Sequence, residues 1–279
     1  MDTQKEKEKE KEQYKLVICV FACATIPQYK NEIKKIEETW GARAIKKNVK
    51  VIYFLGEEKT DLDNPAKYIY LKNVGNDYSS AMDKQNLGLK YIYENFITDF
   101  IYCCGTDTYV NVDNMLNYIN TFDSNDALYI GGHGSRRNIN DNSLYFHCGG
   151  AGFIISLVAL NAVYPKLDDV TEEWPKICIE SNHNGELFTL YPSIDKSCDV
   201  ALSYYLQNII GSDLKIIENK NSFFGCNYKG IVHHKSVGMF YTCCNNIIDW
   251  KTLISCHCMS SSDFDEFTKI LEEHNYYSI

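Results

Sequence analysis

The first half of the chain alternates apolar segments with amphipathic ones, and this alternation constrains the fold more than any other feature. Short segments rich in β-branched and aromatic residues predict buried strands over residues 15–23, 49–56 and 99–104. Between and after them, apolar residues recur at helical spacing and predict helices over residues 31–44, 76–96 and 112–122. We therefore expect an α/β fold with a mostly parallel central sheet flanked by helices, and ligands at the carboxyl ends of the strands.

The second half is less regular. Residues 127–132 and 143–152 resemble strands that run into glycine-rich turns, and residues 153–164 predict a mostly buried helix. We expect a polar loop over 165–197 and a further helix over 199–210. Residues 1–13 alternate Lys and Glu without an apolar face and predict a charged disordered tail, followed by a single domain over residues 14–279.

Composition excludes several classes of function. The formal net charge of −9 argues against a nucleic-acid partner, because phosphate binding needs a clustered basic face. No apolar segment approaches the ~20 residues of a membrane helix, and no signal peptide is recognisable, so we expect a soluble, cytoplasmic protein. The 12 cysteines lack the paired spacing of a zinc ribbon, and we expect mostly reduced thiols.

The segment "CGTDTYVNVDN" (103–113) places Asp107 directly behind a predicted strand. A carboxylate in this position suits a divalent cation, which would neutralise a diphosphate leaving group. The alternative is an Asx turn, in which Asp107 accepts hydrogen bonds from its own loop.

The segment "HCGGAGFIIS" (147–156) holds three glycines within four positions. Such a run indicates a close backbone approach or positive φ, and its N–H groups suit an anion or sugar hydroxyls. The alternative is a purely structural turn. The segment does not match the GxGxxG pattern of dinucleotide-binding folds.

Three other positions have both a functional and a structural interpretation. Asp199, in the first turn of a predicted helix, is either a general base or a helix-capping acid. His257, in "SCHCMSSSDF" (255–264), is either a metal ligand or a structural histidine, and His233 with His234 forms a second candidate pair. Trp174 either stacks on a sugar ring or anchors the loop around it.

Four of these motifs stand in an order that resembles one enzyme family. The segments are "TDTYVNVDNMLNYI", "GGAGFIIS", "CDVALSYYLQNI" and "SCHCMSSSDF", and "ETWGARA" (38–44) adds an early Thr-Trp helix end. They resemble the inverting β-1,3-glycosyltransferases of the fringe and core 1 galactosyltransferase type. The core 1 enzymes are most similar, through "DTYVNVDN" and a Cys-Cys pair before a late His. The resemblance spans roughly residues 15–272.

The resemblance implies a GT-A glycosyltransferase fold, a UDP-sugar donor and Mn²⁺. Asp107 and His257 match the family's metal ligands, and Asp199 matches the acid taken as the catalytic base. Thr106 and Lys84 are placed with the donor-binding residues by the same match. The glycine-rich segment that lines the cleft corresponds to Gly149, Gly150, Ala151 and Gly152.

Two departures from the family pattern leave an alternative open. Gly105 and Thr106 replace the first two acids of the Asp-Asp-Asp motif, and no membrane anchor is recognisable. We predict an enzyme that moves a hexose or N-acetylhexosamine to a hydroxyl of a glycan or protein acceptor, through a β-1,3 linkage. The alternative is a degenerate relative that binds a nucleotide-sugar or glycan without turnover.

Overall fold

The computed structural model describes residues 11–77, 79–132, 134–182, 185–229, 231–234, 239–242 and 249–274. A central sheet runs through this part of the chain. Its strands are β1 (Glu12–Phe21), β2 (Lys50–Leu55), β3 (Tyr68–Tyr70), β4 (Phe96–Gly105), β6 (Leu128–Gly131), β9 (Phe153–Ser156) and β10 (Lys215–Glu218). Short strands outside it are β5 (Tyr109–Val110), β7 (Gly134–Ile139), β8 (Asn142–His147), β11 (Phe223–Phe224), β12 (Ile231–His234), β13 (Met239–Thr242) and β14 (Ser255–Cys256).

The central sheet has the strand order β10-β6-β9-β4-β1-β2-β3. Every neighbouring pair is parallel except those made by β9, which runs antiparallel to both β4 and β6. The mostly parallel sheet predicted from the alternation of segments is confirmed.

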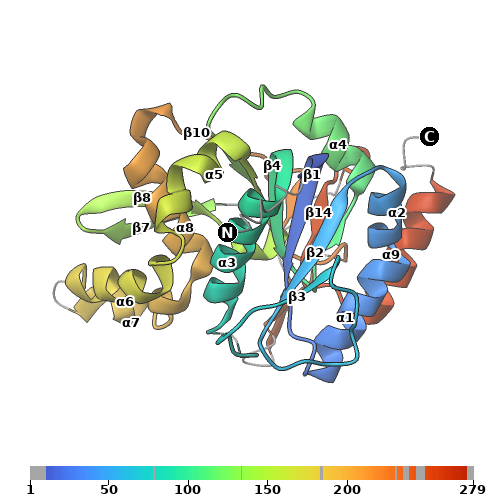
Figure 1. Ribbon diagram of the computed structural model, residues 1–279, viewed down its shortest axis with the longest axis horizontal. Coiled ribbons are helices and arrows are strands. Elements are labelled where there is room, and N and C mark those ends of the chain that lie inside the picture. The colour runs from blue at the N-terminus through green and yellow to red at the C-terminus, as the bar shows by residue number, and fades with distance from the viewer. Residues whose placement is uncertain are drawn as a thin grey trace, which may run out of the picture.

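Helices cover both faces of the sheet (Figure 1). One face carries α1 (Pro27–Glu38), α2 (Trp40–Lys46), α4 (Val112–Ile119) and α9 (Ser261–Glu273). The other carries α3 (Ala81–Asn95), α5 (Leu157–Val163) and α8 (Cys198–Ile210), and α6 (Val170–Glu180) and α7 (Glu186–Leu190) lie beyond them. Short 3-10 turns are η1 (Gly149–Ala151), η2 (Tyr164–Lys166), η4 (Ile194–Lys196) and η5 (Gly211–Asp213).

The central strands are buried on both faces because each face has its own helical layer. In β1, Ile18 belongs to the same buried cluster as Ile33 of α1, whereas Val17 belongs to the cluster that contains Leu89 of α3. All of these side chains are fully buried. Burying one such side chain contributes roughly 1.5–3 kcal/mol, so the two layers fix the sheet and the positions of its strand ends.

Three sequence predictions need correction. The helix predicted over 31–44 is interrupted at Thr39, where α1 ends and α2 begins. The helix predicted over 153–164 is wrong in its first four residues, which form β9. A short apolar run does not distinguish a strand from a helix, and the boundary is set by Ser156, whose side chain caps α5 by accepting from the Ala159 N–H.

The loop predicted over 165–197 is also wrong, because it contains α6 and α7. Val170, Trp174 and Cys178 recur at a spacing of four and form the buried stripe of α6, which its acidic residues obscure in the sequence. Trp174 is fully buried, and its Nε1 donates to the Ile194 carbonyl at 2.8 Å. Trp174 therefore anchors this region and does not present its ring to a sugar.

The beginning of β1 overlaps the segment predicted as a tail. Glu12 and Gln13 pair with Phe96 and Ile97 of β4, while residues 1–10 of that segment lie outside the described residues. None of the helices in the described segments is both long enough and apolar enough to span a membrane.

Candidate active site

The candidate site lies where the central strands end. Phe21 of β1 and Gly105 of β4 are paired neighbours, so the residues that follow them, including Asp107, lie at the same edge of the sheet. Strand β9 is antiparallel to β4, so the glycine turn η1 that precedes β9 reaches this edge as well. Polar side chains from distant parts of the sequence thus meet here.

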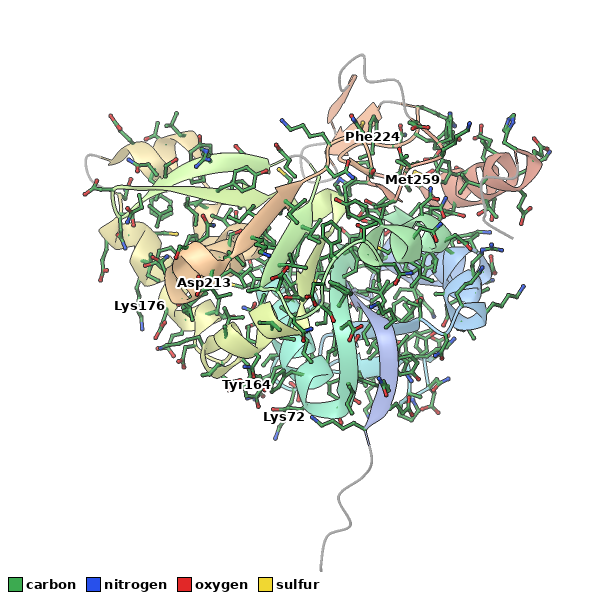
Figure 2. All side chains as sticks on the ribbon, turned by 90° about the horizontal axis from the view of Figure 1, so that it is seen from above. Lys72, Tyr164, Lys176, Asp213, Phe224 and Met259 are labelled. Carbon is green, nitrogen blue, oxygen red and sulfur yellow. The ribbon has the colours of Figure 1, made fainter. Side chains whose placement is uncertain are left out.

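Two short strands bring Asp107 and His257 together. Strand β14 pairs antiparallel with β5, Cys256 against Tyr109, and the Met259 N–H donates to the Asp107 carbonyl at 2.9 Å. The His257 N–H donates to the Phe224 carbonyl at 3.0 Å, and Figure 2 shows Phe224 and Met259 close to one another. In this arrangement His257 Nε2 lies 3.5 Å from Asp107 Oδ2.

The second imidazole nitrogen also has neighbours. His257 Nδ1 lies 3.4 Å from the Gly225 carbonyl and 3.3 Å from Cys258 Sγ. An Nδ1–H directed at a carbonyl makes Nε2 the nitrogen that would bind a cation, as in many metal sites. Strand β14 ends at Cys256, so the chain is not extended beyond His257. Cys258 has φ of 58°, and its thiol lies against the ring.

The Asp107–His257 pair has an unusual proton affinity. Burial alone lowers the pKa of His257, but the adjacent Asp107 carboxylate and the Cys258 thiol raise it to about 10. The protein alone therefore holds His257 protonated and paired with Asp107 at neutral pH. A cation that binds Nε2 must displace this proton.

The glycine turn η1 packs directly against the two groups predicted to do chemistry. A Cβ on Gly150 would lie 2.4 Å from Cε1 and Nδ1 of His257, so only glycine fits against the ring. The Gly149 N–H donates to Asp199 Oδ2 at 2.8 Å. Adjacent residues of one turn thus contact His257 on one side and Asp199 on the other.

The rest of the turn is fixed by buried hydroxyls. Tyr102 and Ser255 donate to the Ala151 carbonyl at 2.7 Å and 2.6 Å, and the Thr108 hydroxyl donates to the Gly150 carbonyl at 2.9 Å. Gly152 has φ of 74°, and a Cβ there would lie 2.1 Å from the Tyr102 hydroxyl oxygen. The predicted positive φ is confirmed at Gly152, and three buried hydroxyl groups hold the turn in place.

Asp199 lies in the first turn of α8 and is partly exposed. Its Oδ1 accepts from the Val200 N–H at 2.9 Å, in addition to the bond from Gly149. Burial raises the pKa of Asp199, and these backbone N–H groups offset only part of that rise. The carboxylate therefore supports the helix start, as the structural interpretation requires, and is also a stronger base than an ordinary aspartate.

Lys84 lies on α3 near the end of β1 and is 3% exposed. Burial lowers its pKa, and Cys23 and Asp77 lie near enough to raise it in part. Within the described ranges its ammonium group makes no hydrogen bond or salt bridge, and the buried Asn76 Oδ1 likewise lacks a hydrogen-bond partner. A buried cation without a direct salt bridge in the described ranges, beside the strand ends, suits an anionic ligand.

Thr106 has an acidic neighbour that sequence reasoning missed. Its hydroxyl donates to Glu32 Oε2 at 2.5 Å, and Glu32 of α1 is only 1% exposed. The sequence did offer one signal for Glu32: it directly precedes Ile33, which lies on the apolar face of the predicted helix over residues 31–44. A carboxylate from another element thus lies beside the turn in which Gly105 and Thr106 replace two acids.

The candidate metal ligands, Asp107 and His257, supply only part of the coordination shell of a divalent cation. Asp107 Oδ2 and His257 Nε2 are close enough to share one ion, and carboxylate oxygen with imidazole nitrogen is a suitable combination for Mn²⁺. Over the described ranges no cluster of three or more His, Cys, Asp or Glu side chains is arranged around a metal position. Two protein ligands therefore fit the ion only if substrate and water supply the rest. The side chains of His233 and His234 lie outside the described residues.

A separate cavity does not overlap this site. It measures about 270 Å³ and lies at the amino ends of the strands, lined among others by Tyr14, Glu37 and Lys50. None of the predicted site residues contributes to it.

Together, the glycine turn, the paired acid and imidazole and the second acid define an α/β protein with a polar ligand site at its strand ends. The sequence matches the Fringe-like family over residues 15–224. The chain therefore belongs to the Fringe-like family of glycosyltransferases, which confirms the resemblance drawn from its motifs. His257 lies beyond the matched range, so its assignment depends on its geometry.

One solved structure similar to this chain is described as "Crystal structure of a glycosyltransferase involved in the glycosylation of the major capsid of PBCV-1". The two chains are 14% identical, with a TM-score of 0.49, over 91% of this chain and 98% of the other. Comparison with curated proteins gave no match.

Proposed function

We propose that the protein is an inverting glycosyltransferase that moves a hexose or N-acetylhexosamine from a UDP-sugar to a hydroxyl of a glycan or glycoprotein, through a β-1,3 linkage. One observation carries the proposal: Gly149 contacts Asp199 while Gly150 contacts His257, which is paired with Asp107. A single turn thus separates a candidate base from a candidate diphosphate site, the arrangement that displacement from opposite faces of a sugar requires.

The donor side consists of Asp107, His257 and Lys84. When bound between Asp107 and His257, Mn²⁺ would neutralise charge on the departing diphosphate. Lys84 supports the same step, because its buried ammonium group is positioned to attract phosphate oxygens. Thr106 directly precedes Asp107 and donates to Glu32, so this hydroxyl and carboxylate lie at the turn that would hold the donor.

The acceptor side is built around Asp199. A carboxylate whose pKa is raised by burial takes a proton from an acceptor hydroxyl more readily than an exposed one does. The hydrogen bonds from Gly149 and Val200 hold it in place. They also leave lone pairs on both oxygens for the incoming hydroxyl.

One observation favours a second candidate, a protein that binds the donor without turnover. The turn itself carries only one carboxylate, that of Asp107, and the neighbouring Glu32 already accepts a hydrogen bond from the Thr106 hydroxyl. We infer turnover nevertheless, because Gly149 and Gly150 place a second acid, Asp199, across the turn from the Asp107–His257 pair, where a general base is needed.

UDP release from a panel of UDP-sugars separates the two candidates. Each donor is incubated with Mn²⁺, with and without EDTA, using the wild type, Asp199→Asn and the matched control Asp213→Asn. Asp213 is exposed just beyond the opposite end of α8. We expect EDTA-sensitive release that Asp199→Asn suppresses and Asp213→Asn does not. Donor binding without release under any condition would favour the binding protein.

We also propose that the protein acts in a reducing, cytosol-like compartment. All ten cysteines in the described residues are unpaired. Secreted proteins of this cysteine content usually form disulfides.

A further inference from the structure

Arg137, whose guanidinium lies over two aromatic rings, is on the acceptor side of the site. Arg137 belongs to β7, which pairs with β8 in a hairpin that packs against α8. Strand β8 continues through Cys148 directly into Gly149, which is hydrogen-bonded to Asp199. The hairpin is therefore a direct extension of the candidate site.

Aromatic rings hold the guanidinium of Arg137 in one place. Its Cζ lies 3.8 Å from the ring centroid of Tyr191 and 4.8 Å from that of Phe146. Stacking of this kind fixes an arginine without neutralising its charge. Nη1 donates to the Ser135 hydroxyl and the Arg136 carbonyl, both at 2.8 Å.

The charge of Arg137 has no counter-ion in the described part of the chain. None of the salt bridges there includes Arg137, although the sequence holds 37 acidic residues against 28 Lys and Arg. Its Nε is shielded from solvent and has no hydrogen-bond partner among the described residues. An ordered arginine without a carboxylate partner is a binding group for an anion.

Arg137 is near enough to Asp199 for its charge to act on the carboxylate. Burial raises the pKa of Asp199 and of Cys148, and Arg137 acts in the opposite direction on both, so its charge reaches the candidate base. The hydrogen bonds found for Asp199 come from Gly149 and Val200, so the guanidinium is not engaged by the carboxylate. The donor-side groups, Asp107 and His257, lie on the other side of η1.

We propose that Arg137, stacked on Tyr191, binds an anionic substituent of the acceptor, so that the acceptor is an acidic sugar carrying a carboxylate or a sulfate. This inference rests on the proposed function, because it takes the Asp199 side as the acceptor side. The planar guanidinium matches two oxygens of either group. The acceptor hydroxyl then lies near Asp199 because its acidic neighbour is held by Arg137.

The test measures binding, so that its outcome does not depend on turnover. Calorimetry in the presence of UDP compares methyl glucuronide with methyl glucoside, and a 6-sulfated sugar with its unsulfated form. The wild type should bind the acidic member of at least one pair roughly 10- to 100-fold more tightly. The pair that shows the preference identifies carboxylate or sulfate as the anion.

Variants assign the preference to Arg137. Arg137→Gln should remove it and Arg137→Lys should retain part of it. Arg136→Gln should keep it in full, because Arg136 is exposed and lies over Tyr145 instead. The acid-to-neutral ratio is taken within each variant, so a general loss of stability cancels.

Two results would overturn the proposal: equal affinity of the wild type for acidic and neutral sugars, or an unchanged ratio in Arg137→Gln. Failure of the proposed function is a separate result. It would appear as absent UDP release from every donor, whatever sugars the protein binds.

Discussion

Replacing Gly150 with alanine tests whether the glycine turn exists to accommodate His257. The added Cβ would lie 2.4 Å from two ring atoms, whereas carbon atoms in contact are roughly 3.5–4.0 Å apart. The ring or the turn must therefore move by on the order of 1 Å, and overpacking of this kind costs about 1–3 kcal/mol. Gly150 is not among the glycines with positive φ, so the backbone itself tolerates alanine.

The assay is a double-mutant cycle read by urea unfolding. Gly150→Ala should destabilise the wild type by about 1–3 kcal/mol but should be nearly neutral in the His257→Ala protein, where the opposing ring is gone. Gly149→Ala is the matched control, because its Cβ would meet Asp199 at 3.3 Å, and it should add to His257→Ala without coupling. An equal cost of Gly150→Ala in both backgrounds would refute the contact as the reason for glycine.

Three further predictions concern charged groups. Asp199→Asn should cost less than about 1 kcal/mol of stability but about 10²–10⁴ in turnover; near-normal turnover by a UDP-release assay would shift the base role to Asp195, the nearby acid in η4. Mn²⁺ affinity, measured by calorimetry, should rise about tenfold per pH unit between pH 7 and 9, because the ion displaces a proton from His257, whose pKa is about 10; a plateau above pH 7.5 would contradict this. Burial raises the pKa of Asp113, but Arg43 and Lys47, at 2.5 Å and 2.9 Å, outweigh burial and hold the pKa below its ordinary value of about 4. The stability from this carboxylate is present above pH 4 and lost as the pH falls through the lowered value, so Asp113→Asn should flatten the acid side of the urea-stability profile; an unchanged profile would exclude the pair as a source of acid sensitivity.

Much of the central sheet could be predicted from the sequence because its core strands have a local signal, a continuous apolar run. Strands β1, β2 and β4 are buried on both faces and therefore form continuous apolar runs, and Asp107 directly follows the last of them. Where the local signal is ambiguous the prediction failed. The run over residues 153–164 is mostly apolar, and only the cap at Ser156 divides it into a strand and a helix.

The contacts within the candidate site could not be predicted from local sequence patterns. Asp107 meets His257 through β5 and β14, strands of two residues each that carry no recognisable pattern. The pairing was expected only from the family resemblance, and the structure supplies its geometry. Glu32, Cys258 and Arg137 were missed because their roles depend on neighbours far away in sequence or, for Cys258, on a left-handed φ.

The central claim is that Asp107 and His257 together hold the cation that binds the donor diphosphate. The most direct measurement is the affinity for UDP, by calorimetry with and without Mn²⁺, of the wild type, Asp107→Asn and the exposed control Asp123→Asn. We predict that Mn²⁺ strengthens UDP binding in the wild type and the control but not in Asp107→Asn. The free energy of unfolding of Asp107→Asn, measured with urea, should lie within about 1 kcal/mol of the wild-type value. Metal-dependent UDP binding that survives in a folded Asp107→Asn protein would contradict the claim and return Asp107 to the role of a turn residue.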